Sequence, residues 1–317
     1  MTDAQAGAAT PEADDRAFYT VLEESRDEAA NTTTTLVETH RCTTGMWDPG
    51  HQHAGPPAAL LAHCISRHDM PADFRLADVK MDIFGPIPVA PLTVTTEVIR
   101  GGRTMDLLQA TAAPTDRPDR PAVQVRAWRI RRAPETYPVV TGHREVAAPG
   151  DGVGEDGAPR ALGRAAGATL RGGETFPGPE DLDAQALNFN PHATKEGYGS
   201  AVEWRWVSGG PGTLAPALVW GRCLVPLVQG RETSGWEKLL VLADSAGGIS
   251  LPVDTRKYRY VNCDMHVALD RDPEGDWILL DAQAIATPGH GGIVHDELSD
   301  RRGVLGVGVS TMVTGEL

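Results

Sequence analysis

The feature that most constrains this chain is an almost uninterrupted apolar stretch that contains one aspartate. Residues 235–250 read G-W-E-K-L-L-V-L-A-D-S-A-G-G-I-S. Apolar side chains recur in it at helical spacing, and Gly247 and Gly248 can end a helix. We therefore expect a helix over residues 236–247 that is buried on most sides. Burying a carboxylate on such a helix costs free energy unless the carboxylate is paired. Asp244 therefore indicates a functional site. The alternative is that its side chain points outward between two elements.

The composition indicates a globular protein with an acidic surface. The 317 residues are 41% hydrophobic and 23% charged, and the net charge is −14. An acidic surface argues against nucleic acid or an anionic membrane as the main partner. No apolar run reaches the length of a membrane span, and the four cysteines include no C-x-x-C pair. We expect a reduced, cytoplasmic protein without disulfides.

The same order of elements occurs twice along the chain. A buried helix is predicted over residues 54–68 in the first half, and strand-like runs follow it at 77–84, 92–100, 104–112 and 122–130. In the second half, strand-like runs at 201–207 and 217–223 precede the helix at 236–247, and others follow at 258–269, 277–287 and 304–314. This order predicts an internal repeat of domain size.

Composition also predicts where the domains begin and end. Residues 1–15 are small and acidic and predict a disordered tail. Residues 142–190 are rich in Gly, Pro and Ala and predict a linker. The two structured units are then residues 16–141 and residues 191–317.

A sheet wrapped around one central apolar helix is the hotdog architecture. The repeat therefore predicts an α+β double hotdog with two antiparallel sheets, each wrapped around a long central helix. Several motifs occur in a recognisable order: H-Q-H-A-G-P-P-A-A-L-L-A at 51–62, F-G-P-I-P-V-A-P-L-T-V at 84–94, L-A-D-S at 242–245, N-C-D-M-H-V-A-L-D-R at 262–271 and G-V-L-G-V-G-V-S-T at 303–311. With these motifs the chain resembles the acyl-CoA thioesterase II (TesB-like) family over nearly its whole length outside the tail and linker.

The resemblance implies hydrolysis of fatty acyl-CoA, or of an acyl-carrier thioester, by an activated water without a cofactor. In that family an Asp on the second helix, a Thr on the next strand and a Gln on the last strand bind the water. Asp244 matches the Asp, whereas Asn262 and Thr311 stand where the family has Thr and Gln. All three can hydrogen-bond, so we expect them to converge on one water. Asn262 on a solvated strand face, and Thr311 as a tolerated small residue, are the alternatives.

The residues before the first helix are expected to bind the substrate. Backbone N–H groups at a helix start can hold the thioester oxygen, and Gly55 would let it approach closely, although an ordinary helix-start glycine is the alternative. His51 and His53 lie just before it and are assigned to the same region. A metal site is not predicted, because no third His or Cys stands at ligand spacing.

Two other functions remain open on the sequence. A double-hotdog dehydratase or hydratase would pair a histidine, as in His51-x-x-x-Gly55, with Asp244. A non-catalytic acyl-binding protein would keep the fold with an altered site, as the departures at Asn262 and Thr311 allow. The resemblance also implies a homo-oligomer.

Overall fold

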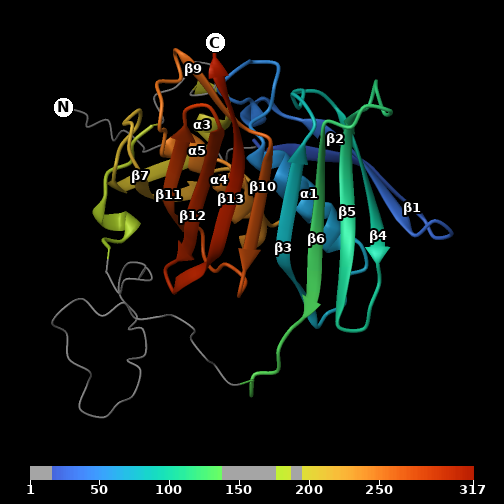
Figure 1. The fold of residues 1–317 in the computed structure, drawn as a ribbon. Helices are drawn as coiled ribbons and strands as arrows, with labels where there is room; N and C mark the ends of the chain where they lie inside the picture. Colours follow the sequence, from blue (N-terminus) through green and yellow to red (C-terminus); the bar gives the residue numbers. More distant parts are fainter. Residues whose placement is uncertain (1–15, 138–175, 187–194) are drawn as a thin grey trace, which may run out of the picture.

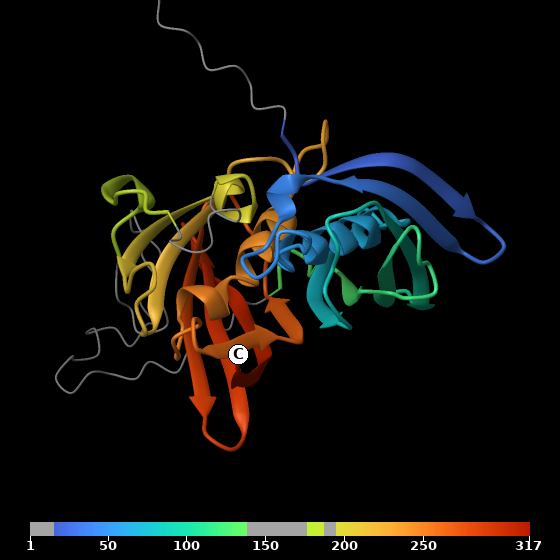
Figure 2. The same ribbon diagram turned by 90° about the horizontal axis from the view of Figure 1, so that it is seen from above.

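The computed structural model describes residues 16–137, 176–186 and 195–317. The expected tail at 1–15 and most of the expected linker at 142–190 lie outside these residues. The described chain forms one large antiparallel sheet with few helices. The two main helices, α1 and α4, lie side by side in the middle of the molecule (Figure 1; Figure 2).

The N-terminal half has six strands and one long helix. Its elements are β1 (Tyr19–Asp27), β2 (Thr32–Thr39), the turn η1 (Arg41–Thr43), α1 (Gly55–Arg67), β3 (Phe74–Ile83), β4 (Leu92–Arg100), β5 (Met105–Pro114) and β6 (Val123–Arg131). The first turn of α1 contains Pro56 and Pro57, where a missing N–H leaves no helical bond unmade. Every residue from Gly55 to Ile65 is buried, because strands β3–β6 and helix α4 surround α1.

The C-terminal half repeats this plan with a shorter main helix. Its elements are α3 (Tyr198–Ala201), β7 (Val202–Ser208), β8 (Ala217–Cys223), α4 (Gly235–Ala243), α5 (Ala246–Ile249), β9 (Tyr258–Asn262), β10 (Asp264–Leu269), β11 (Ile278–Thr287), β12 (Gly291–Asp300) and β13 (Gly303–Glu316). A capping box starts α4: Ser234 Oγ accepts from the Glu237 N–H, and the Glu237 carboxylate accepts from the Ser234 N–H.

The strand order confirms the internal repeat and corrects the expected number of sheets. The order is β1-β2-β4-β5-β6-β3 in the first half and β7-β8-β11-β12-β13-β10 in the second, with β9 paired to β13. β3 and β10 pair with each other, with Met81 opposite Met265. Two separate sheets were expected, but this pairing joins the described parts of the two halves into one sheet of thirteen strands.

Two predicted elements differ in the structure. The helix expected over 236–247 ends at Ala243, and a separate turn of helix, α5, contains Gly247. The break occurs because the Ser245 N–H bonds to the carbonyl of Leu242, three residues back, which tightens the chain. β12 was not predicted, because Asp296 lies on its buried face between Val294 and Leu298 and hides the alternation.

A short segment inside the expected linker packs against the sheet. Phe176 and Leu182 contact the face of β8 that carries Leu218 and Trp220, opposite the face covered by α4. The Trp220 Nε1–H donates to the Pro177 carbonyl at 3.0 Å. Residues 176–186, which include the turn η2 (Pro179–Asp181), are therefore part of the folded C-terminal half.

Candidate active site

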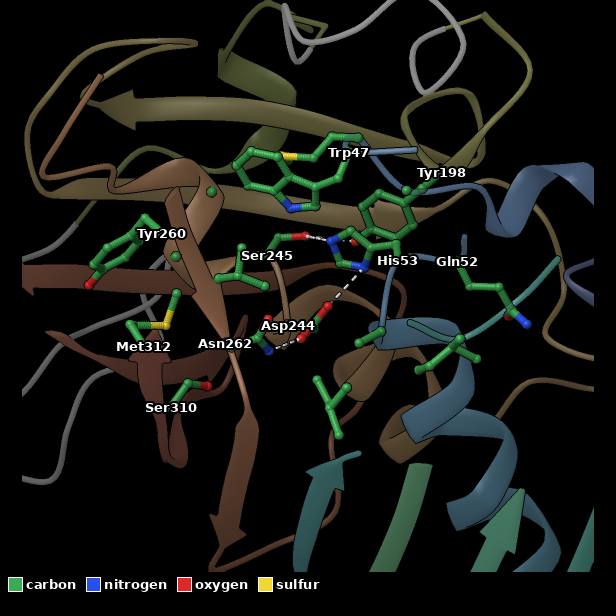
Figure 3. A pocket seen from close by; sticks show the side chains of 18 of the residues that line it. Trp47, Gln52, His53, Tyr198, Asp244, Ser245, Tyr260, Asn262, Ser310 and Met312 are labelled. Atoms are coloured by element: carbon green, nitrogen blue, oxygen red, sulfur yellow. Dashed lines mark hydrogen bonds and ion pairs between the residues drawn. The ribbon is translucent and has the colours of Figure 1, made fainter. Parts of the chain in front are cut away.

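Asp244 lies at the end of α4 and is almost fully buried, with 4% of its side chain exposed. The C-terminus of a helix carries partial negative charge, so a carboxylate is not stabilised there by the helix itself. Its Oδ1 accepts a hydrogen bond from Asn262 Nδ2 at 2.6 Å, and its Oδ2 lies 3.0 Å from His53 Nδ1. These three side chains come from α4, β9 and the loop before α1, so both halves build the site (Figure 3).

His53 is held in a fixed orientation. Its ring stacks on Tyr198, with centroids 3.8 Å apart and planes 3° from parallel. Tyr198 is itself held, because its hydroxyl donates to the Val241 carbonyl at 2.9 Å and lies 2.8 Å from Ser245 Oγ. Burial lowers the pKa of His53, and the nearby Asp244 carboxylate only partly opposes this. The imidazole is therefore neutral near pH 7 and carries a single N–H.

The surroundings of the ring indicate where that proton lies. Nδ1 has two neighbours, the Asp244 carboxylate at 3.0 Å and the Gly55 N–H at 3.2 Å. The Gly55 N–H donates to Nδ1, so Nδ1 is the acceptor and the single N–H lies on Nε2, 3.5 Å from Ser245 Oγ. Asp244 Oδ2 lies 3.0 Å from Nδ1 as a close polar contact, and the stacked ring limits where the carboxylate can lie.

Asn262 faces the site because the register of the chain changes directly after it. In β13, Met312 pairs with Asn262 and Val309 pairs with His266. The chain from Asn262 to His266 is therefore one residue longer than the β13 segment opposite it, and this irregularity begins at Cys263. The irregularity places Asn262 on the side of the helices with Asp244 and turns Asp264 to the other side. Unbroken alternation would put Asn262 and Asp264 on the same face, and this irregularity separates them.

The site opens into a pocket with a cavity volume of about 150 Å³. Trp47 lies at its mouth and is 47% exposed, whereas Tyr260 and Met312 at its inner end are 3% and 6% exposed. Figure 3 shows Asp244 between His53 and Asn262, with Tyr260 and Met312 beyond Asn262. No Lys or Arg is among the described residues that line it. The pocket therefore suits an apolar group at its inner end with a reacting polar group beside Asp244.

Thr311 is not part of this site, and its prediction was wrong. A β-bulge places one extra residue, Leu305, in β13 opposite β12. Beyond the bulge, odd-numbered residues of β13 point to the outer face instead of the buried one. Leu305 is therefore buried, but Val309 is 42% exposed. Thr311 follows Val309 outward, where its N–H and Oγ1 donate to Asp264 at 2.5 and 3.1 Å. Met312 occupies the pocket side instead, so Asp244, Asn262 and Thr311 do not converge on one water.

Of the three residues predicted to bind substrate, only His53 lines the pocket. His51 is 42% exposed at its side chain and lies 3.9 Å from Asp48. Gly55 serves the packing of the helices, because a Cβ there would lie 2.2 Å from the Val241 carbonyl oxygen of α4. Its N–H is directed at His53 Nδ1, so it was wrongly predicted to face the thioester.

The polar residues of the site that were not predicted include Tyr198, Ser245 and Gln52. Ser245 directly follows Asp244, and Gln52 directly precedes His53. Both could have been predicted from these neighbouring candidate residues. Gln52 Oε1 accepts from the Tyr19 hydroxyl at 2.6 Å, and its Nε2 donates to a backbone carbonyl. Tyr198 comes from a distant segment, and no pattern in the sequence connects it to the site.

Of the two main helices of the repeat, α4 is followed by a buried carboxylate and α1 has a cysteine at the equivalent position. Asp244 and Cys64 stand at the same distance from the first residues of their helices, Gly235 and Gly55. Burial raises the pKa of the Cys64 thiol to about 12, so it stays protonated and offers no base. Within the described ranges, no group of three or more His, Cys, Asp or Glu side chains is placed to hold a metal, and no helix is long and apolar enough to cross a membrane.

Similar proteins of known structure share this fold over nearly the whole chain. A putative thioesterase from Novosphingobium aromaticivorans has a TM-score of 0.61 at 15% identity, covering 92% of this chain and 97% of that one. A hotdog-fold protein of unknown function from Alicyclobacillus acidocaldarius has a TM-score of 0.61 at 13% identity, covering 92% and 96%. An acyl-CoA thioesterase II from Mycobacterium marinum has a TM-score of 0.56 at 13% identity, covering 93% and 97%. At these identities the likeness shows the hotdog fold alone.

The family matches are more specific. No curated protein matches this sequence. The family model for the acyl-CoA thioesterase N-terminal domain matches residues 43–130, and the model for the C-terminal domain matches residues 177–312. The matched segments include His53, Asp244 and Asn262, and together they span well over half of the chain. This chain therefore belongs to the acyl-CoA thioesterase family.

Proposed function

We propose that this protein hydrolyses the thioester of an acyl-CoA to a free acid and CoA, with Asp244 as the general base. The observation that carries the proposal is the Asp244 carboxylate, which is buried, oriented by two side chains and exposed to an apolar pocket. A general base must keep an acceptor free for the proton that it takes. Asn262 uses one acceptor of a carboxylate that has about four, so acceptors remain free for the attacking water.

In this mechanism Asp244 takes a proton from a water as the water oxygen attacks the thioester carbon. The tetrahedral intermediate then collapses, the C–S bond breaks, and the departing sulfur takes that proton from Asp244. Asn262 and His53 position the carboxylate through the reaction. No cofactor is consumed.

The test is the release of free thiol from acyl-CoA by Asp244→Asn. Loss of a general base costs about 10²–10⁴-fold in rate, and the substituted amide keeps the size of the side chain, so folding should persist. Asp264→Asn is the matched control, because Asp264 lies two residues beyond Asn262 but faces away from the pocket. It should keep the parental rate. Hydrolysis by Asp244→Asn at the parental rate would refute the mechanism.

One contact favours a second candidate, a dehydratase or hydratase. The 3.0 Å approach of His53 to Asp244 is the kind of His–Asp pairing that such chemistry uses. However, a histidine that moves protons on a substrate must present a free ring nitrogen, and both nitrogens of His53 contact side chains. A 2-enoyl-CoA distinguishes the two reactions. Loss of the conjugated double bond without thiol release would favour hydration, and neither change would favour the non-catalytic acyl-binding alternative.

We also propose that residues 16–141 and residues 191–317, the latter together with the packed segment 176–186, are the two hotdog units of a cytoplasmic homo-oligomer. Cys64, Cys223 and Cys263 form no disulfide, which suits a reducing compartment. Five apolar side chains on the outer face of the adjacent strands β11, β12 and β13 are 41–49% exposed and suit a contact between copies. They are Ile285, Ile293, Val307, Val309 and Val313.

Light scattering tests the oligomer. Val309→Asp should dissociate it, whereas Ile99→Asp should not, because Ile99 is similarly exposed but lies on β4 of the other half. A parent protein that is monomeric at every concentration would contradict this assembly.

A further inference from the structure

The pocket beside Asp244 is small for a fatty acyl chain. Its volume of about 150 Å³ must hold both the attacking water and the acyl group. An apolar cavity of about this volume accommodates one benzene molecule. The space therefore suits an acyl group of about six carbons, extended or in a single ring.

Tyr260 closes the inner end of the pocket as a rigid wall. Its hydroxyl lies within hydrogen-bond distance of two backbone carbonyls, 3.2 Å from Ile285 O and 2.9 Å from Ile293 O. The ring also rests on Gly292, where a Cβ would lie 2.7 Å from Tyr260 Cε2. Because the ring is anchored at its hydroxyl and packed against backbone, it cannot move aside for a longer chain.

Met312 forms the adjustable part of the same wall. It lines the pocket from β13 and is 6% exposed. Its terminal methyl lies beside Gly247 of α5, where a Cβ would be 3.1 Å from Met312 Cε. A methionine side chain is unbranched and has no polar anchor, so its volume can be removed without leaving a polar group unpaired.

On the basis of the proposed thioesterase activity, we infer that the substrate carries a short or single-ring acyl group of about six carbons and that Met312 sets this limit. Each methylene that enters an apolar pocket contributes about 0.8 kcal/mol, which is about four-fold in kcat/KM. This gain should end once the carbons reach Tyr260 and Met312. Longer chains must then remain outside in water or displace packed side chains.

The experiment measures kcat/KM with butyryl-, hexanoyl-, octanoyl-, decanoyl- and palmitoyl-CoA, below the concentrations at which long-chain substrates form micelles. The parent should gain about four-fold per methylene up to hexanoyl-CoA and then level off or fall. Met312→Ala should move the optimum to octanoyl- or decanoyl-CoA and raise the decanoyl-to-hexanoyl ratio about ten-fold or more. Met312→Leu, which nearly conserves volume, should keep the parental profile. A parental gain that continues to palmitoyl-CoA, or an unchanged profile in Met312→Ala, would overturn the inference.

Binding separates this inference from the proposed reaction. Calorimetry with non-hydrolysable S-butyl-, S-hexyl- and S-decyl-CoA thioethers reports the size of the pocket without catalysis. An affinity limit near six carbons that shifts in Met312→Ala supports the assigned acyl class, whether or not a thioester is cleaved. Failure to cleave any thioester would refute the hydrolase alone. Hydrolysis together with affinity that keeps rising to S-decyl-CoA would refute the size limit alone.

Discussion

Asp296 should make this protein less stable as the pH rises from the acid range to neutrality. It lies on the buried face of β12, is 4% exposed, and its Oδ2 has no hydrogen-bond partner in the described part of the chain. The opposite residue of β13 is Gly308, which leaves room for the Asp296 side chain. A Cβ at Gly308 would lie 2.1 Å from Asp296 Oδ1. Burial, and secondarily the charge of Asp281, raises the pKa of Asp296 from 3.8 to about 7.

The sign and size of the effect follow from this raised pKa. Below pH 3.8 the carboxyl is protonated in both folded and unfolded chains and has no effect. Between pH 3.8 and pH 7 the unfolded chain loses the proton while the folded one keeps it, so the free energy of unfolding falls by about 1.36 kcal/mol per pH unit. Above pH 7 the loss is complete and amounts to about 4 kcal/mol.

Asp296→Asn removes the titration and nearly keeps the shape. Urea unfolding at pH 5.5 and pH 8.5 should show the variant gaining about 2 kcal/mol relative to the parent between the two values. Asp116→Asn is the control, since Asp116 is 78% exposed at its side chain and should shift little at either pH. If the difference between Asp296→Asn and the parent is the same at both pH values, Asp296 is not the buried, unpaired acid described above.

Two further predictions concern the junction of the helices. Gly55→Ala should lower the free energy of unfolding by about 1–3 kcal/mol in urea, because its Cβ would meet backbone of α4, whereas Gly101→Ala, with only one atom as near as 3.9 Å, should not. His53→Gln should reduce thioester hydrolysis by about 10²-fold while thioether binding persists, because Asp244 loses its orientation. Burial lowers the pKa of His53, so below pH 6.5 the unfolded chain binds a proton that the folded one does not. The parent should therefore lose stability as the pH falls from 6.5, and His53→Gln should lose less, as read from urea midpoints.

Most of the fold could be predicted because local patterns and packing agree. The helix α1 and the strands β4 and β8 appear within a residue or so of their predicted bounds. The alternation of apolar and polar residues did not predict β12, because a charged residue, Asp296, is buried in that strand. It also could not show that β3 and β10 pair, because nothing in either strand records which edge meets which.

The site was harder to predict than the fold, because faces depend on single-residue irregularities. Alternation is reliable only along an unbroken strand, and one extra residue exchanges the two faces. The bulge at Leu305 turned Thr311 out of the site, while the irregularity at Cys263 separated Asn262 from Asp264. His53 was predicted near the substrate, but its contact with Asp244 depends on how α1 and α4 pack together.

The buried carboxylates of the described chain have different partners, and those partners limit what each can do. Arg129 holds Asp106 with two bonds of 2.8 and 2.6 Å, and Arg271 holds Asp300 with two bonds of 2.6 and 2.7 Å. A guanidinium that binds both oxygens of a carboxylate neutralises its charge and occupies its acceptors. These two aspartates are therefore structural and poor bases.

The remaining buried carboxylates differ in the same respect. Glu237 bonds to His63 at 2.7 Å and to the Ser234 N–H at the start of α4, so one oxygen serves the contact between the helices and the other caps α4. Asp296 is half protonated near pH 7, and it does not line the pocket. Asp244 has a neutral imidazole and an amide as partners, which orient its carboxylate without supplying a full positive charge. Because it also faces the pocket, it is the buried carboxylate best placed to take a proton from a water beside a thioester.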